Sequence, residues 1–378
     1  MRPLEGITVL DFGQFLAAPS GAMRLADLGA HVIKVEKEPD GDVCRRMYTS
    51  NLIIEGESSL FQSINRNKDG ISLNLKSEEG RKKLEPLLRQ ADVVIVNFRP
   101  GVAARLGLSY QQVSAINPKV IYGEITGYGP MMDWAARPGQ DLLVQSLSGL
   151  CWLNGNGDQP PVPMGLSVVD MFAGQQMVQG ILAALVGRET SGEGAYIQAS
   201  LMEAALDMQF EVLTTYLNDG KRLPERSSVN NANVYTNAPY GIYATEEGYL
   251  ALAMVNIPYL GELIGCEALL AYQDEADWSE KRDEIKAIIR DHLMTRKASQ
   301  WLEILEPKDI WCARVLNWEE LMETDGFRAL EFLQEVEFES GRRMTTTRCP
   351  ITIDGERYRS AKPAPSLGQD NGQYLYSD

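Results

Sequence analysis

Asp170 is the one charged residue in the stretch PVPMGLSVVDMFAGQQM, residues 161–177. Its neighbours are apolar: Val168–Val169 precede it and Met171–Phe172 follow it. A helical pattern begins here, and it allows two interpretations. The carboxylate either caps the amino end of that helix or acts as a nucleophile that becomes acylated during catalysis. The local pattern alone favours the cap, so the rest of the sequence has to decide.

Chemistry based on histidine or cysteine is not expected. The chain has only two histidines. His31 opens an apolar run typical of a strand, and His292 lies in a charged helical pattern that predicts exposure to solvent. The five cysteines are scattered without CxxC spacing, which indicates reduced thiols and a cytoplasmic location, with neither disulfides nor a metal site.

Composition narrows the classes of partner. The chain has 378 residues, 44% of them hydrophobic, which is ordinary globular composition with room for two domains. The net charge of −16 argues against general binding of nucleic acid. No apolar run reaches the length of a membrane span and the first residues do not resemble a signal peptide, so no membrane partner is expected.

The first third of the chain alternates short apolar runs with helical patterns. Helices are expected at residues 19–29, ending at Gly29, and at 77–90, with Ser77 as N-cap; strands are expected at residues 6–12, 31–36, 91–98 and 119–129. Buried strands separated by helices predict an α/β fold whose parallel sheet is covered on both faces, a Rossmann-like doubly wound core.

The remaining chain is expected to be more helical. The pattern predicts two long helices at 170–188 and 200–220, then a polar linker or site loop at 219–241. A β-hairpin is expected at 241–255, with helical segments from about 278 to 335.

A dinucleotide-binding enzyme is a weak alternative. Glu36 ends the second predicted strand, where an acidic residue could hold a ribose. However, the loop DFGQFLAAPSG lacks the GxGxxG pattern that lets a backbone approach a pyrophosphate closely, and no GxxxxGK[ST] loop is present.

Several stretches, in order along nearly the whole chain, resemble the family III CoA-transferases, the group of formyl-CoA transferase and carnitine CoA-transferase. They include PLEGITVLDFGQFLAAPSGAMRLADLGAHVIKVEKEPDGD, ADVVIVNFRPGVAARLGLSYQQVSAINPKVIYGEITGYGP, PVPMGLSVVDMFAGQQMVQGILAAL and APSLGQD. The family also has 2-methylacyl-CoA racemase relatives.

The resemblance implies an architecture that periodicity could not predict. A large Rossmann-like CoA-binding domain would take residues 1–218 with 330–378, and a linker and smaller α+β domain would take 219–329. Two subunits would interlock as a homodimer, with active sites at their interface.

The resemblance also implies that Asp170 is the nucleophile. Its carboxylate would form a mixed anhydride with the acyl group of an acyl-CoA, then an aspartyl-CoA thioester that a free carboxylic acid attacks. Unpaired N–H groups at the helix start would keep it ionised, and Gly165, Ala173 and Gly174 would leave space for the thioester.

Gln140 distinguishes a transferase from a racemase. A racemase needs two bases that flank the α-carbon, and the position where the racemases have their histidine holds Gln140 here. An amide cannot exchange protons near neutral pH but can donate to a developing oxyanion, so a transferase is favoured. Asp141 is an alternative base, although a structural role is expected for it. A catalytically silent CoA-binding homologue is a third hypothesis.

The resemblance places the contacts to CoA on residues in the loops that follow the strands. These residues are Ala17, Lys37, Asn74, Lys76, Asn97, Phe98, Arg99 and Arg105. CoA would be part of the substrate, and no tightly bound cofactor is expected. Leu16 replaces a glutamine of formyl-CoA transferase, and the glycine-rich loop of that enzyme has no counterpart, so specificity for oxalate is not expected.

Overall fold

The computed structural model describes residues 2–47, 49–130 and 133–376. Contacts within the chain divide it into two compact units. The first is built from residues 1–144, 167–208 and 329–378, and the second from 145–166 and 209–328. The predicted domains, 1–218 with 330–378 and 219–329, stay a prediction; the units differ from them chiefly in residues 145–166, which contact the second unit.

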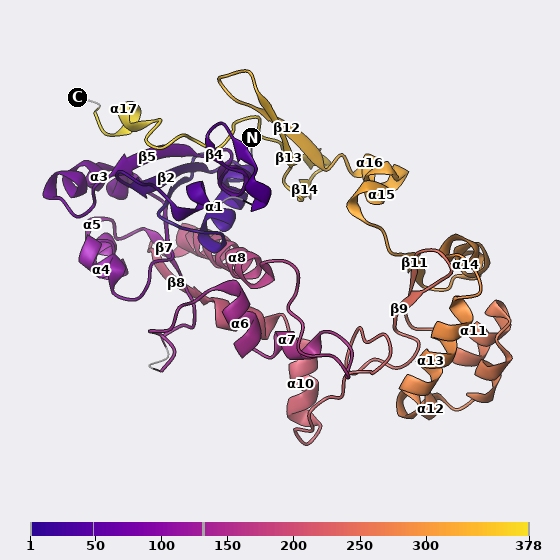
Figure 1. Ribbon diagram of the computed structural model, residues 1–378. Coiled ribbons are helices and arrows are strands. Elements are labelled where there is room, and N and C mark those ends of the chain that lie inside the picture. Colours follow the sequence, from indigo (N-terminus) through magenta and orange to yellow (C-terminus); the bar gives the residue numbers. More distant parts are fainter. Residues whose placement is uncertain (1, 48, 131–132, 377–378) are drawn as a thin grey trace. The chain divides into compact units, whose positions relative to one another are not determined.

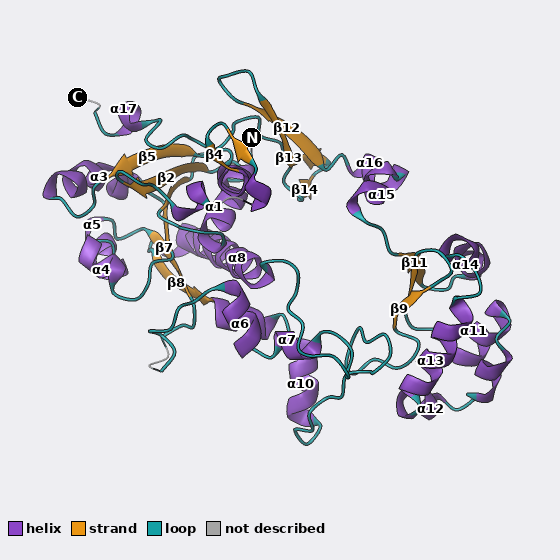
Figure 2. Cartoon of the chain, in the orientation of Figure 1, coloured by secondary structure: helices purple, strands orange, loops and turns teal. Residues whose placement is uncertain are grey.

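A six-stranded parallel sheet forms the centre of the first unit (Figures 1 and 2). Its strands, in chain order, are β1 (Thr8–Asp11), β2 (His31–Lys37), β5 (Asp69–Leu73), β6 (Val93–Val96), β7 (Ile121–Thr126) and β8 (Ala195–Ser200). They are arranged β5-β2-β1-β6-β7-β8, and every neighbouring pair is parallel. The prediction of a parallel α/β sheet is therefore confirmed. The order reverses between β1 and β6, and ligands of open α/β sheets bind at such a reversal.

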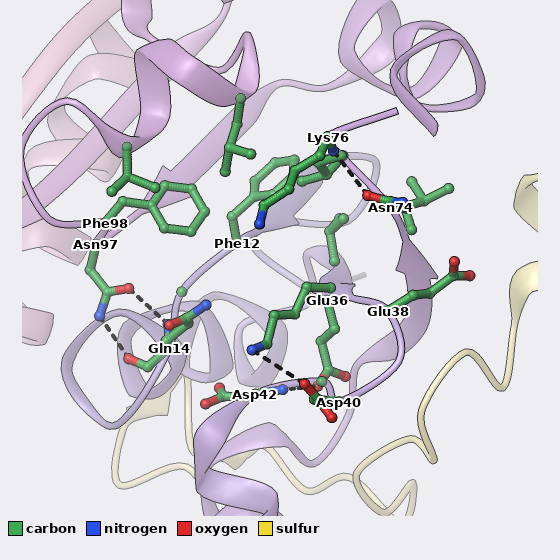
Figure 3. Close-up of a pocket in the computed structure, with 18 of the residues that line it drawn as sticks. Phe12, Gln14, Glu36, Glu38, Asp40, Asp42, Asn74, Lys76, Asn97 and Phe98 are labelled. Carbon is green, nitrogen blue, oxygen red and sulfur yellow. Dashed lines mark hydrogen bonds and ion pairs between the residues drawn. The ribbon is translucent and has the colours of Figure 1, made fainter. Parts of the chain in front are cut away.

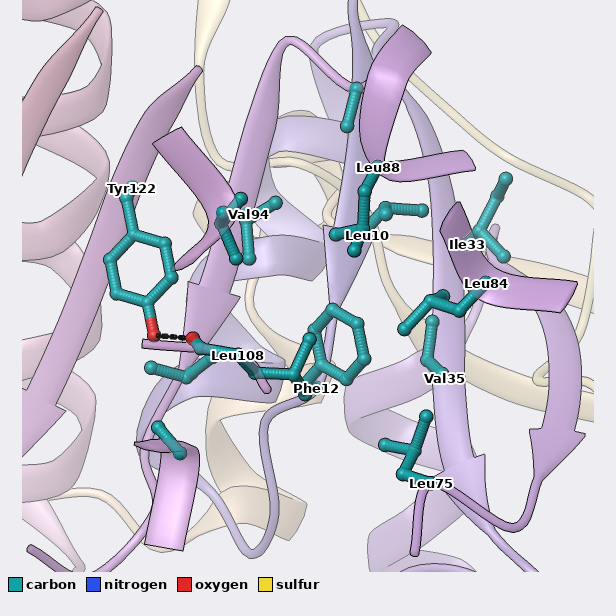
Figure 4. Close-up of a cluster of buried hydrophobic side chains, with 14 of the residues drawn as sticks. Leu10, Phe12, Ile33, Val35, Leu75, Leu84, Leu88, Val94, Leu108 and Tyr122 are labelled. Atoms are coloured by element: carbon teal, nitrogen blue, oxygen red, sulfur yellow. Dashed lines mark hydrogen bonds between the residues drawn. The ribbon is translucent and has the colours of Figure 1, made fainter. Parts of the chain in front are cut away.

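The strands form because their side chains are buried on both faces. All four residues of β6 are buried, as are five of the seven residues of β2. Leu10 pairs with Ile33 on one side and with Val94 on the other. Figure 4 shows the cluster on one face, where the Tyr122 hydroxyl donates to the Leu108 carbonyl at 2.6 Å.

Helices cover the sheet. In chain order they include α1 (Ala17–Asp27), α2 (Ser59–Asn65), α3 (Glu78–Gln90), α4 (Val102–Leu106), α5 (Tyr110–Ile116), α6 (Asp141–Leu147), α8 (Val168–Ser191), α9 (Leu201–Asp207) and α17 (Asn371–Tyr374), with short 3₁₀ turns η1 (Val43–Arg46) and η2 (Thr49–Asn51). Ser77 caps α3 as predicted, because its hydroxyl accepts from the N–H of Gly80. Gly29 follows α1 with a φ of 109°.

α1 and α8 pack closely against each other. A Cβ at Gly174 would lie 2.6 Å from the carbonyl oxygen of Ala17, and one at Gly21 would lie 2.9 Å from the carbonyl oxygen of Gly174. Gly174 was expected to leave space for a thioester. That expectation is wrong, because the backbone of α1 occupies the space.

α8 is the one helix of the described residues that is long and apolar enough to cross a membrane by length and composition. In the structure it packs against α1, α9, β7 and β8. These contacts bury 44% of the apolar stretch, so packing within the unit accounts for part of its composition.

Short antiparallel pairs and the C-terminal segment complete the first unit. The pairs are β3 (Ile53–Ile54) with β4 (Glu57–Ser58), β12 (Leu333–Glu337) with β13 (Arg343–Thr347), and β14 (Thr352–Ile353) with β15 (Glu356–Arg357). The C-terminal segment runs beside the edge strand β5. The Asp370 carboxylate accepts from the N–H of Gly70 at 2.7 Å, and the Asn371 side chain accepts from the N–H of Ser72 at 2.8 Å.

The second unit has a small antiparallel sheet with helices packed on it. The sheet order is β11 (Cys312–Arg314), β10 (Tyr249–Leu252) and β9 (Gly241–Ala244), so the predicted hairpin is confirmed. Its other elements are α7 (Leu150–Leu153), α10 (Phe210–Asn218), α11 (Ile257–Ile264), η3 (Glu267–Ala271), α12 (Glu275–Glu280), α13 (Arg282–Leu293), α14 (Ala298–Leu305), η4 (Glu306–Lys308) and α15 (Trp318–Glu323), and α16 (Asp325–Leu330) spans the unit boundary.

Two helical predictions are wrong in extent. The pattern at 200–220 is split into α9 and α10 at Met208–Gln209, where the chain passes from the first unit to the second. The predicted helical region from about 278 to 335 is interrupted by β11 and ends in β12. In both cases tertiary pairing overrides the local pattern.

The close approach of α1 and α8 gives a test of the fold. We expect Gly174→Ala to destabilise the protein by about 1–3 kcal/mol, because the new methyl group meets backbone that cannot move away. Gly187→Ala is the matched control: it lies in the same helix with nothing within 4 Å of its Cβ position, and it should stabilise by about 0.5–1 kcal/mol. Denaturant unfolding of both variants measures the difference. Equal effects would contradict a tight crossing at Gly174.

Candidate active site

A cavity of about 660 Å³ opens at the carboxyl ends of the sheet strands in the first unit. It lies where the loops that follow β1, β2, β5 and β6 meet (Figure 3). This is the edge at which the strand order reverses, the usual binding position in such sheets.

The structure brings six of the predicted CoA contacts together in this cavity. They are Lys37 at the end of β2, Asn74 and Lys76 after β5, and Asn97, Phe98 and Arg99 after β6. The resemblance alone placed them near one another, and the sheet topology supplies the reason, because all of them follow parallel strands at one edge.

The remaining predicted contacts do not line the cavity. Ala17 is buried at the start of α1, where its carbonyl accepts from the Ser20 hydroxyl. Arg105 is in α4 between Val102 and Leu106, which do line the cavity. Gln140 is exposed and immediately precedes α6, and the glycine before it is in close backbone contact with Gly127 at the end of β7.

The cations that line the cavity differ in whether a carboxylate already pairs with them. Lys37 lies 3.7 Å from Asp40, and both side chains are about half exposed, so the pair is weak. Among the residues described, neither Lys76 nor Arg99 forms an ion pair. These two cations are therefore free to meet an anionic ligand in a chain whose net charge is −16.

Asn97, whose predicted contact with CoA stays a prediction, also has a structural role. Its Oδ1 accepts from the N–H of Gln14 at 2.8 Å, and its Nδ2 donates to the carbonyl of Gln14 at 2.7 Å (Figure 3). The amide thus clamps the β1–α1 loop, residues 12–16, with one N–H group and one lone pair of the side chain. Sequence reasoning missed this clamp because it joins residues from two strands that are far apart in the chain.

Buried charges lie beneath the same loop. Lys34 is fully buried in β2 and donates to the carbonyl of Gly13 and, at 2.9 Å, to Asp42. Burial alone would lower the pKa of Lys34, but Asp11 and Asp42 outweigh it, and the pKa is raised. The lysine therefore stays charged.

A second buried lysine holds the start of α1. Lys68 donates to Asp11 at 2.8 Å and to the carbonyl of Pro19 at 2.9 Å. Burial lowers its pKa to about 8, although Asp11 opposes the shift.

The burial of Lys34 had one signal in the sequence. In the run HVIKVE this lysine lies between two β-branched residues, Ile33 and Val35, as expected for a position inside a buried strand.

Glu36 cannot act as the ribose ligand of the dinucleotide alternative. Its carboxylate accepts from the Arg45 guanidinium at 2.6 and 2.8 Å and from the N–H of Asp42 at 2.8 Å. These partners occupy both oxygens, so the residue serves the fold of the loop after β2.

Asp170 lies in the first turn of α8 and is partly buried. It is not the cap of the helix. Oδ2 of Asp141 accepts from the N–H groups of Val169 and Asp170 at 2.9 and 3.1 Å, so Asp141 performs that role. These hydrogen bonds agree with the structural role that was expected for Asp141.

The charge state of Asp170 differs from the expectation. Burial, followed by the negative charge of Asp141, raises the pKa of Asp170 from 3.8 to about 7. The helix start was expected to keep the carboxylate ionised. That expectation is wrong, because Asp141 uses the N–H groups and adds its own charge. Across the described residues, no group donates a hydrogen bond to this carboxylate.

The surroundings of Asp170 connect it to the β1–α1 loop. Gly174, one turn further along α8, lies against the carbonyl of Ala17, with which α1 begins. The charge of Asp170 also acts on Cys44, a thiol whose pKa is raised to about 12, first by burial and then by Asp42. Leu16 packs on the same small cluster as Cys44. The thiol is therefore protonated and unreactive, which leaves the carboxylate as the nucleophile candidate.

Neither histidine takes part in this site. His31 is exposed at the start of β2 and bonds to Asp69 at 2.8 Å, and His292 in the second unit bonds to the carbonyl of Ile264 at 2.9 Å.

Known proteins resemble the chain over its whole length. It is 31% identical over 384 residues to the succinate–glutarate CoA-transferase of Agrobacterium fabrum, covering 99% of this chain and 95% of that one. It is 33% identical over 310 residues to the acetyl-CoA:oxalate CoA-transferase of Acetobacter aceti, covering 80% and 78%.

Solved structures agree with the sequence comparisons. The crystal structure of Rv3272 from Mycobacterium tuberculosis matches with a TM-score of 0.85 and 27% identity over 99% of each chain. A CAIB/BAIF family protein from Brucella suis matches with a TM-score of 0.85 and 28% identity over 98% of each chain.

The model of the CoA-transferase family III matches residues 4–371. The expected family is therefore confirmed, and the chain belongs to the family III CoA-transferases.

Proposed function

We propose that this enzyme moves CoA from an acyl-CoA thioester to a free carboxylic acid, with Asp170 as the nucleophile. The observation that carries the proposal is a partly buried carboxylate without a hydrogen-bond donor among the described residues, at the start of a helix that packs on α1, which follows the loop that lines the cavity. A carboxylate that serves only the fold would have a partner.

The reaction proceeds through two kinds of covalent intermediate. A carboxylate oxygen of Asp170 attacks the thioester carbonyl and expels the CoA thiolate, giving a mixed anhydride. The thiolate attacks the aspartyl carbonyl and releases the donor acid, giving an aspartyl-CoA thioester. The acceptor carboxylate attacks that carbonyl and expels the thiolate again. The thiolate then takes the acceptor acyl group and frees Asp170. Each step exchanges derivatives of similar reactivity, so no intermediate is a deep trap.

Binding of CoA falls to the cavity. Lys76 and Arg99 supply unpaired cations for its phosphates, supported by Lys37, while Asn74 and Phe98 line the wall. Arg105 reaches the same ligand from α4, and the backbone of Ala17 approaches the thioester end. Asn97 contributes by fixing the loop. CoA is the substrate, and no tightly bound cofactor is part of the mechanism.

Gln140 favours transfer over racemisation. Its side chain is exposed, and it has no hydrogen-bond partner in the described part of the chain, which suits a donor to the oxyanion that forms at the thioester carbonyl. Racemisation needs a second base there, which an amide cannot be. A silent CoA-binding homologue would have no use for a carboxylate whose pKa is about 7.

An interlocked homodimer of Rossmann-like large domains in the cytoplasm completes the proposal. Large apolar side chains are exposed in each unit, among them Leu142 in the first and Trp318, 77% exposed, in the second. Such exposure suits faces that a partner subunit covers. The five free cysteines suit a reducing compartment.

Replacing Asp170 tests the mechanism. We expect Asp170→Asn to lower transfer between thioester and free acid by at least about 10³-fold, because an amide forms no anhydride. Wild-type enzyme incubated with acyl-CoA and then hydroxylamine should carry a hydroxamate at residue 170 by peptide mass spectrometry. Asp158→Asn, at an exposed aspartate, is the control and should keep full activity. Undiminished transfer by Asp170→Asn would overturn the mechanism.

The rate should depend on pH through Asp170. Since the pKa of the free enzyme carboxyl is about 7, kcat/KM should fall about tenfold per pH unit below 7 and level off above it. Asp141→Asn keeps an oxygen acceptor for the helix N–H groups but removes a charge that raises this pKa. The acid limb of its profile should therefore move to lower pH. An unmoved limb would show that another group titrates.

Thermal stability should depend on pH, because ionising the carboxyl of Asp170 is less favourable in the folded state than in the unfolded state. The folded pKa of Asp170 lies above its ordinary value of 3.8, so the free energy of unfolding should fall as pH rises from about 4 to about 7 and stay level above that. Relative to wild type, Asp170→Asn should raise the thermal midpoint more at pH 8 than at pH 5, where only part of this loss has occurred. Calorimetry at both pH values measures this, and an equal shift at both would rule out ionisation as the cause.

A further inference from the structure

Phe15 combines an unfavourable backbone with an exposed ring. Its φ is 59°, in the left-handed region that aromatic residues rarely adopt, and its side chain is 47% exposed. A large apolar side chain gains little from such a position in the fold. Strain of this kind persists only where surrounding groups enforce it, and it gathers at functional sites.

The β1–α1 loop is held by side chains on nearly every backbone group. Asp11 accepts from the N–H of Gly13 at 2.8 Å, and Lys34 donates to the Gly13 carbonyl. The Asn97 clamp takes both backbone groups of Gln14. Asp42 then accepts from the N–H of Phe15 at 3.3 Å. These contacts fix the conformation from outside, so the strain does not come from the needs of the ring.

Phe15 belongs to the loop that joins the cavity to α1, the helix that packs on α8. Phe15 lines the cavity. Two residues later, Ala17 begins α1, and its carbonyl lies against α8 one turn beyond Asp170. The segment from Phe15 to Ala17 therefore connects the cavity, whose lining does not include Asp170, to the helix that carries Asp170.

The charges near Asp170 disfavour an acidic acyl group. Asp141 is the charged group that acts on it, and no cation pairs with it among the described residues. The neighbouring η1 turn, whose Cys44 senses the charge of Asp170, presents Val43 and Met47 as exposed apolar side chains. The unpaired cations of the cavity, Lys76 and Arg99, are assigned above to the phosphates of CoA. The second carboxylate of a dicarboxylic acid would therefore find no cation among the groups that act on Asp170.

We propose that Phe15 is a specificity-determining residue whose ring packs on the acyl chain, so that the enzyme prefers apolar monocarboxylic acyl groups to dicarboxylic ones. This inference rests on the proposed transfer through Asp170. It assigns the strained loop a purpose: to present an aromatic surface where the acyl chain must lie.

The test compares hexanoate with succinate as acceptors, with acetyl-CoA as donor. Wild-type enzyme should show the higher kcat/KM for hexanoate. Phe15→Ala and Phe15→Gly should each lower the hexanoate-to-succinate ratio of kcat/KM about tenfold or more, because the apolar contact is lost. Phe15→Leu, which keeps apolar bulk, should retain most of the ratio. A wild-type preference for succinate, or a ratio that the alanine and glycine variants leave unchanged, would overturn the proposal.

Stability separates this role from a structural one. The alanine and glycine variants lack the same ring and differ in tolerance of a positive φ, so Phe15→Gly should melt about 2–4 °C above Phe15→Ala. A ring needed for packing would instead make both variants melt well below wild type by similar amounts, and that outcome would contradict the proposal. Asp170→Asn assayed in parallel separates the two proposals. If this variant transfers CoA as fast as wild type, the mechanism through Asp170 fails. If it is inactive while the Phe15 variants keep the wild-type ratio, only the assignment to Phe15 fails.

Discussion

Two buried lysines hold the segment on which the rest of the site depends. Lys34 and Lys68 lie in the interior of the first unit, and each binds an aspartate and a backbone carbonyl, Gly13 and Pro19 respectively. Taking such ions out of water is expensive, and hydrophobic residues would often stabilise a core as well. The buried charges fix the path of the chain, because each ammonium group holds one end of the connection between β1 and α1. The cavity wall, the strained residue of the loop and the start of α1 all follow from that connection.

Asp170, the nucleophile candidate, differs from these buried charges in its hydrogen bonding. The buried carboxylates of Asp11, Asp42 and Glu36 have donors, whereas Asp170 has none in the described part of the chain and faces the charge of Asp141. Asp141 satisfies the helix start that would otherwise have stabilised Asp170. A carboxylate left in this state is less stable as an anion, and under the mechanism proposed above this local instability makes Asp170 a more reactive nucleophile.

The sequence predicted the parallel sheet, the Ser77 cap and the small hairpin because these depend on patterns within a few residues. The positions of Lys37, Asn74, Lys76, Phe98 and Arg99 around one cavity came from family resemblance, and the strand order explains it. The clamp by Asn97 and the burial of Lys34 could not be predicted, because each joins strands whose neighbours are fixed only by the sheet topology. The break at Met208–Gln209 escaped notice for a similar reason: an unbroken helical pattern says nothing of where a chain leaves one compact unit.

The C-terminal segment has a consequence for the growth of the chain on the ribosome. β5 has one strand partner, β2, and its other side is closed by Asp370 and Asn371, which lie 300 and 299 residues further along from Gly70 and Ser72. Throughout most of synthesis, the first unit therefore displays an open strand edge that any other extended segment can pair with. A nascent chain of this protein therefore leaves the edge of β5 open to other extended segments until Asp370 and Asn371 have been synthesised.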